Sequence, residues 1–85
     1  MFLENIINQK RRNIMPVFRI TATSTRVFNG QRLDKGLYVD VQTYGYGNPI
    51  INEKEKVAYA FFTRGVDLKK MGALNTSCLT AKRIG

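Results

Sequence analysis

The chain has 85 residues, 44% of them hydrophobic and 24% charged, which is enough for one small domain with a core near the lower limit of unaided folding. No apolar run approaches the roughly 20 residues that a membrane-spanning helix needs, so we expect a soluble, cytoplasmic protein without a membrane partner. The single cysteine, Cys78, excludes an internal disulfide and a multi-thiolate metal site. The net charge of +8 favours nucleic acid, acidic proteins or anionic membrane surfaces as partners without choosing among them.

Residues 1–14 form an N-terminal extension that we interpret separately from the body, residues 15–85. The run Lys10-Arg11-Arg12 can be encoded by a purine-rich bacterial ribosome-binding sequence, and two codons then separate it from the codon of Met15. We therefore expect Met15 to be the biological start and residues 1–14 to be translated upstream message; the alternative is a genuine basic arm. Without residues 1–14 the chain loses three basic residues and Glu4, so its net charge falls from +8 to +6 and the body stays basic.

Two segments, 17–25 and 37–43, alternate apolar and polar residues with the period of a half-buried strand. The turn signals Asn29-Gly30 and Asp34-Lys35-Gly36 lie between them, and residues 31–33 prolong the hairpin arm. We therefore expect two antiparallel strands. The side chains expected to face inward are Phe18, Ile20, Ala22, Leu37, Val39 and Val41, and those expected to face outward are Arg19, Thr21, Thr23, Tyr38, Asp40 and Gln42.

The rest of the chain predicts a loop, a helix and a third strand. Residues 44–49 cannot continue a strand, because their glycines and proline remove side-chain packing and a ladder donor. Asn52 is expected to be the N-cap of a helix over residues 53–64, and Gly65 ends it. Asp67 caps a short turn over residues 68–71, which Gly72 ends. The expected core stripe is Val57, Ala58, Phe61 and Phe62, joined by Leu68 and Met71, with Tyr59 facing a partner.

Residues 77–84 return to an extended pattern and make the third strand. The order β-β-α-β predicts an α+β fold in which a small antiparallel sheet of about three strands has one helix packed on one face. Such a sheet leaves two edges and one face open to pairing with another copy.

The chain contains no histidine, the usual general base, proton shuttle and metal ligand. The five carboxylates after Met15 belong to turns, helix ends and a strand, and nothing brings an acid and a base together. Cys78 has no adjacent activating base, although Lys82 lies four residues further on, so we interpret it as an inert strand cysteine. We therefore expect no enzyme activity, no bound metal and no cofactor.

The segment Tyr44-Gly45-Tyr46-Gly47 lacks the Gly-x-Gly-x-x-Gly spacing and the Lys-Ser/Thr pair of nucleotide-binding loops. Its tyrosines would either stack on bases or ring-shaped ligands or pack over the end of the sheet, and packing is the commoner role of aromatic residues.

Basic residues fall into two groups, one on the outward face of the first strands and the hairpin arm, the other near the C-terminus. Positive charge there would follow phosphates and release counterions. The alternatives are a solvated hairpin arm and lysines that favour the dipole of a short helix. The candidate nucleic-acid-binding residues are Arg19, Arg26, Arg32, Tyr38, Tyr44, Tyr46, Lys69, Lys70, Lys82 and Arg83.

Four stretches carry a resemblance to known proteins: Phe18–Ala22, Lys35–Val41, Ala60–Phe62 and Val66–Lys70. Together they are similar to small uncharacterised proteins of bacterial phages and integrated mobile elements. The resemblance covers most of the body. It implies that the protein is encoded by a short, dense genetic element, of the kind that encodes many small binding proteins. It identifies no site residue.

We expect a small basic protein without catalytic activity that binds nucleic acid or nucleotide phosphate and forms a homo-oligomer. The alternative is a protein-interaction or assembly module of a phage or mobile element that self-associates through a sheet edge.

Overall fold

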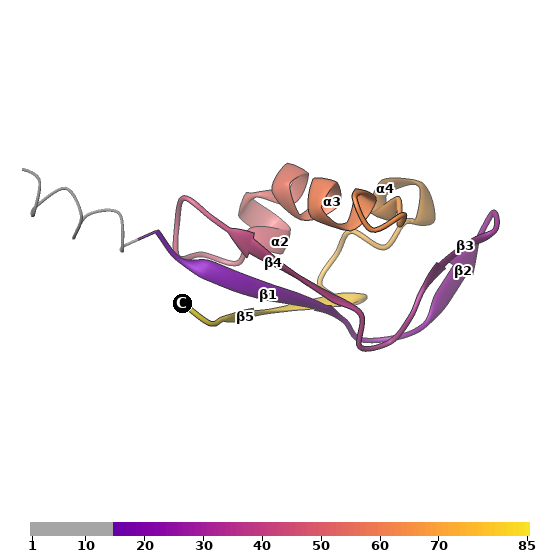
Figure 1. The fold of residues 1–85 in the computed structure, drawn as a ribbon, viewed down its shortest axis with the longest axis horizontal. Helices are drawn as coiled ribbons and strands as arrows, with labels where there is room; N and C mark the ends of the chain where they lie inside the picture. The colour runs from indigo at the N-terminus through magenta and orange to yellow at the C-terminus, as the bar shows by residue number, and fades with distance from the viewer. Residues whose placement is uncertain (1–14) are drawn as a thin grey trace, which may run out of the picture.

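The structure is a computed structural model that describes residues 15–85, so the interpretation of residues 1–14 lies outside the described residues. Three strands, β1 (Val17–Ala22), β4 (Tyr38–Gln42) and β5 (Leu79–Arg83), form an antiparallel sheet in the order β4-β1-β5. Two short strands, β2 (Arg26–Phe28) and β3 (Gln31–Leu33), form a second antiparallel sheet (Figure 1). The predicted α+β class and the three-stranded antiparallel sheet are confirmed.

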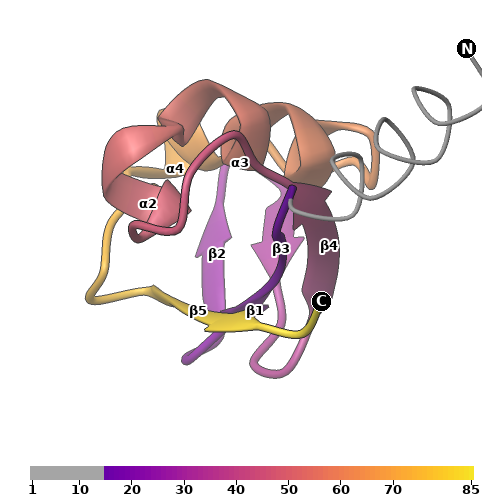
Figure 2. The ribbon, with the colours of Figure 1, turned by 90° about the vertical axis from the view of Figure 1, so that its left-hand side faces the viewer.

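The helices lie on one side of the three-stranded sheet (Figure 2). They are α2 (Pro49–Asn52), α3 (Lys54–Phe62) and α4 (Leu68–Met71). The core forms between them and the inward side chains of β1 and β4, whose alternation was predicted: Ile20 is fully buried, and Phe18, Ala22, Val39 and Val41 are buried as well. The opposite face of this sheet has no helix over it among residues 15–85.

The hairpin arm differs from the expected continuation of the first two strands. β1 ends at Ala22, and the chain bends before β2 begins at Arg26. The turn is at Asn29-Gly30 as predicted, with φ of 48° and 81°, the left-handed conformation of a tight hairpin turn. The backbone N–H of Asp67 donates to Oε1 of Gln31 (2.8 Å), which ties this hairpin to the start of α4.

The prediction that Asn52 begins the helix is wrong. The side chain of Asn48 accepts from the N–H of Ile50 (2.9 Å) and caps α2, with Pro49 at its first position. Asn52 instead ends α2, and Glu53, with φ of −135° and ψ of 51°, separates α2 from α3. The helix begins after Asn48 rather than after Asn52 because Pro49 is preorganised for the first helical position, where its missing N–H costs nothing.

The predicted core stripe of α3 is right for Val57 and Phe61, which are fully buried, and wrong for Phe62, whose side chain is 60% exposed. Phe62 lies five residues after Val57, about 140° further round a helix of 3.6 residues per turn, so it leaves the buried face. The Asp67 cap, the αL conformation of Gly72 and the burial of Leu68 and Met71 are as predicted. Within residues 15–85, no helix has the length and apolar character to cross a membrane.

Candidate functional site

The loop between β4 and α2 is anchored by the carboxylate of Glu53. The N–H of Tyr44 donates to both carboxylate oxygens (3.1 and 3.2 Å), and the N–H of Gly45 donates to Oε2 (3.3 Å). The hydroxyl of the fully buried Thr43 donates to the carbonyl of Gly45 (2.8 Å). A Cβ on Gly47 would overlap Nδ2 of Asn52, so the side chain of Asn52 packs closely against this glycine. The loop therefore has one defined shape, set by the helix junction beneath it.

This shape presents two tyrosines, each with a cation over its ring. The Nζ of Lys56 lies 3.6 Å from the ring centroid of Tyr44, and the Cζ of Arg83 lies 4.6 Å from that of Tyr46. The tyrosines are 78% and 56% exposed, so neither is packed into the end of the sheet, which was the favoured one of the two alternatives. We call Tyr44, Tyr46, Lys56 and Arg83 the tyrosine cluster. Stacking of a cation on an aromatic face is attractive because the face carries negative charge.

Lys56 links the ring of Tyr44 to the end of β4. Its Nζ donates to the carbonyl of Gln42 (3.0 Å) and lies 3.6 Å from Oε1 of Glu53. An open hollow of about 470 Å³ borders the ring of Tyr44. It is lined by Tyr44, Ile51, Asn52, Glu53, Lys54, Glu55 and Lys56. The exposed ring thus adjoins an open hollow that carries two lysines and two glutamates.

Burial on its own would raise the pKa of Glu53, but the N–H groups of Tyr44 and Gly45 and the charge of Lys56 outweigh it, so the pKa lies below its ordinary 4.5. A carboxylate with a lowered pKa stabilises the fold above the unfolded-state pKa, and this contribution is lost as the pH falls through the folded-state value. We expect Glu53→Gln to be less stable than the unmodified chain at neutral pH, with a smaller difference at a pH well below 4.5. Urea denaturation of both proteins at the two pH values checks this, and a difference of the same size in acid would contradict it.

On the open sheet face, Arg19 lies opposite Asp40 on one neighbouring strand and Lys82 on the other. Its Nε and Nη2 donate to the two oxygens of Asp40 (2.9 and 3.2 Å), and its Cζ lies 4.2 Å from the ring centroid of Tyr38. This hydrogen bond raises the pKa of Arg19 and lowers the pKa of Asp40. Asp40 therefore offsets most of the charge that Arg19 was expected to offer a phosphate.

The remaining candidates lie at the far end of the molecule, on the hairpin arm and α4 (Figure 1). Arg32 is ion-paired with Asp34, and Nζ of Lys69 lies 2.7 Å from Oε1 of Glu55. Arg26 and Lys70 lie near these two but in none of the ion pairs among residues 15–85. The structure thus brings Tyr44, Tyr46 and Arg83 together, with Lys82 on the same strand as Arg83, and leaves Arg26, Arg32, Lys69 and Lys70 apart from them.

Sequence reasoning missed Lys56 and the anchoring role of Glu53. The sequence placed Glu53 in the first turn of a helix, and no motif marks a lysine three residues later as the partner of a distant tyrosine. Only the short junction between α2 and α3, which turns Glu53 back toward the loop, creates both contacts.

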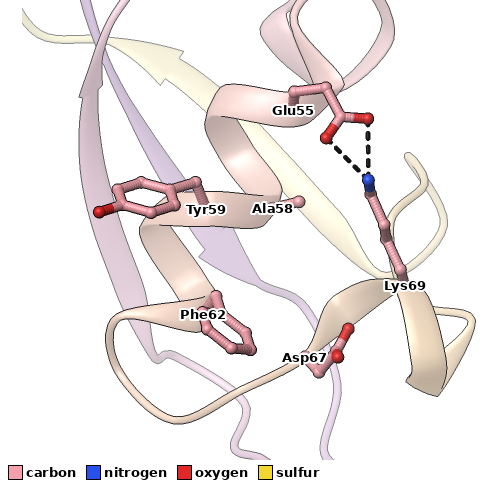
Figure 3. A pocket seen from close by; sticks show the side chains of 6 residues that line it. All are labelled: Glu55, Ala58, Tyr59, Phe62, Asp67 and Lys69. Atoms are coloured by element: carbon pink, nitrogen blue, oxygen red, sulfur yellow. Dashed lines mark hydrogen bonds and ion pairs between the residues drawn. The ribbon is translucent and has the colours of Figure 1, made fainter.

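A second hollow of about 220 Å³ lies between α3 and α4 (Figure 3). Phe62 points across it toward Asp67, whereas the ring of Tyr59 points away from Asp67 and Lys69. The ion pair of Glu55 with Lys69 closes one side, and the carboxylate of Asp67 accepts from the N–H of Lys70 (3.2 Å). The charged groups around this hollow, Glu55, Lys69 and Asp67, thus already have hydrogen-bonding partners within the protein.

Fold and site together define a small basic α+β protein with a preformed tyrosine-bearing loop. The chain belongs to the family of unknown function DUF6140, whose sequence profile matches residues 15–81. No curated protein and no solved structure shows significant similarity to the chain.

Proposed function

We propose that this protein binds single-stranded nucleic acid at the tyrosine cluster, without catalysis and in the cytoplasm. The observation that carries the proposal is the anchored, 78% exposed ring of Tyr44 beside a hollow whose charged lining is Lys54, Lys56, Glu53 and Glu55, the two glutamates being engaged in ion pairs. Proteins that bind single strands combine aromatic rings, on which bases stack, with cations that follow the backbone. The loop supplies both on one surface.

The charge balance supports an anionic ligand. Among residues 15–85, the carboxylates of Asp34, Asp40, Glu53 and Glu55 each form an ion pair, and that of Asp67 caps α4. The excess positive charge of the chain is therefore left without acidic partners inside the described fold. Near the tyrosine cluster it is carried by Lys54 and Arg83, which take part in none of these ion pairs.

The test is a titration of the full chain with labelled oligothymidylate and with a duplex of equal length, at low and physiological salt. We expect the single strand to bind more tightly, because only unpaired bases can stack on Tyr44. With three phosphate contacts, the logarithm of the binding constant should fall against the logarithm of salt with a slope of about −2.

The basic run in residues 1–14 requires a control, because it would bind nucleic acid by charge alone. The variant Lys10→Gln, Arg11→Gln, Arg12→Gln should keep the preference for single strands. Binding that disappears in this variant, or no binding at low salt, would refute the tyrosine cluster as a nucleic-acid site.

Light scattering of the free protein in the same buffers tests the expected homo-oligomer. An origin in phages or mobile elements stays a prediction.

A further inference from the structure

β5 is an outer strand of the sheet, and its hydrogen-bonding pattern shows which of its backbone groups face outward. The N–H of Thr23 donates to the carbonyl of Cys78 (2.9 Å), and the N–H of Ile84 donates to the carbonyl of Val17 (2.8 Å). Bonded positions alternate along an antiparallel pair, so Thr80 and Lys82 also bond to β1. The N–H and C=O groups of Ala81 and Arg83 therefore point away from the sheet, toward an empty strand position.

The other edge, β4, is partly closed. By the same alternation, with Thr43 donating to Pro16 (2.9 Å), the backbone groups of Gln42 point outward from β4. The carbonyl of Gln42 already accepts from Nζ of Lys56 (3.0 Å), so the helix side chain blocks this end of the edge. Within the described residues, β5 offers the less obstructed edge.

The charge on β5 selects what can occupy that edge. Lys82 and Arg83 are exposed and take part in none of the ion pairs among residues 15–85. Cations on an edge strand oppose pairing with a second identical edge. The same cations attract carboxylates, and an alternating row of N–H and C=O groups matches a peptide backbone rather than a nucleic acid.

We propose that the β5 edge binds an extended acidic segment of a partner protein as a fourth strand of the sheet. Ala81 and Arg83 supply the main-chain hydrogen bonds, and Lys82 receives a carboxylate on the open face. This edge shares Arg83 with the tyrosine cluster, through its backbone rather than its side chain, but does not include the ring of Tyr44, and the proposal goes beyond nucleic-acid binding.

The experiment uses a labelled octapeptide of alternating valine and glutamate and a matched peptide of alternating valine and lysine. We expect the full chain to bind only the glutamate peptide, by fluorescence polarisation. Binding should slow hydrogen exchange at the amides of Ala81 and Arg83 and leave the already bonded amides of Thr80 and Lys82 unchanged.

Ala81→Pro removes an outward N–H without touching a bond to β1, and proline is tolerated on edge strands, so the variant should fold. We expect it to bind the glutamate peptide about tenfold more weakly or worse, since main-chain bonds to the added strand are lost. Ala81→Val, which keeps the N–H, should bind normally, and Lys82→Glu should bind weakly whether or not Ala81→Pro folds.

Equal binding of the lysine peptide would overturn the proposal, and so would binding that neither Ala81→Pro nor Lys82→Glu weakens. A third contrary result is protection of the Ala81 amide from exchange in the free protein together with a dimer by light scattering. That result would assign the edge to self-association. Tyr44→Ala should leave peptide binding intact and Ala81→Pro should leave oligothymidylate binding intact, so the two proposals fail independently.

Discussion

Phe61→Ala is expected to lower the free energy of unfolding by about 3–5 kcal/mol, the usual cost of removing a buried phenylalanine ring. Phe61 is fully buried and is the largest of the fully buried side chains in residues 15–85. Small domains are stable by only about 5–15 kcal/mol, so this one change removes a large share of the total. Urea denaturation followed by circular dichroism measures it.

Phe62→Ala is the matched control, because the same ring is removed one residue further along the same helix. Its side chain is 60% exposed, so we expect a change within about 0.5 kcal/mol. Equal destabilisation by the two variants would mean that Phe62 also lies in the core, and the orientation of α3 described above would be wrong.

Tyr44→Ala is expected to weaken binding of oligothymidylate about 5- to 150-fold. This range corresponds to the roughly 1–3 kcal/mol that one base gains by stacking on an aromatic ring. Tyr44→Phe keeps the ring and should bind within about twofold of the unmodified chain if stacking rather than the hydroxyl is responsible. Fluorescence polarisation at physiological salt measures all three proteins.

Tyr59→Ala is the control for loss of an exposed tyrosine. Tyr59 is 70% exposed on α3, outside the tyrosine cluster, so its removal should leave oligothymidylate binding unchanged. Equal losses from Tyr44→Ala and Tyr59→Ala would count against a site at the loop. Because both rings are exposed, both variants should show the circular dichroism spectrum of the unmodified chain.

The three-stranded sheet was predictable because alternation is a local signal. In a strand, apolar and polar residues alternate with a period of two, so the sequence near Ile20 and Val39 predicts that these side chains are buried without information from the rest of the chain. The separate β2–β3 sheet was not, because no residue between Ala22 and Arg26 marks the bend as clearly as Gly30 marks the turn. Asn52 shows a different kind of miss: Asn48 and Asn52 are both suited to helix capping, and Pro49, which favours Asn48, was interpreted only as the end of a strand.

The candidate site was predictable in part for a similar reason. Glycines made residues 44–47 a loop, and its tyrosines were recognisable as ligand-binding candidates from their type alone. Their exposure and their pairing with Lys56 and Arg83 depend on tertiary contacts across 12 and 37 residues of sequence, which no short pattern records. Conversely, Arg19 looked available because its cross-strand pairing with Asp40 requires the register of β1 and β4.

The anchoring of the loop by Glu53 has a kinetic consequence. A loop that already has its binding shape needs no ordering step when a ligand arrives, so the rate of association is set by diffusion and by attraction between charges. Salt should therefore act mainly on the association rate constant, whereas removal of the Tyr44 ring should act mainly on the lifetime of the complex. In the proposed function, Glu53 would therefore act on the association rate through the shape of the loop that it holds.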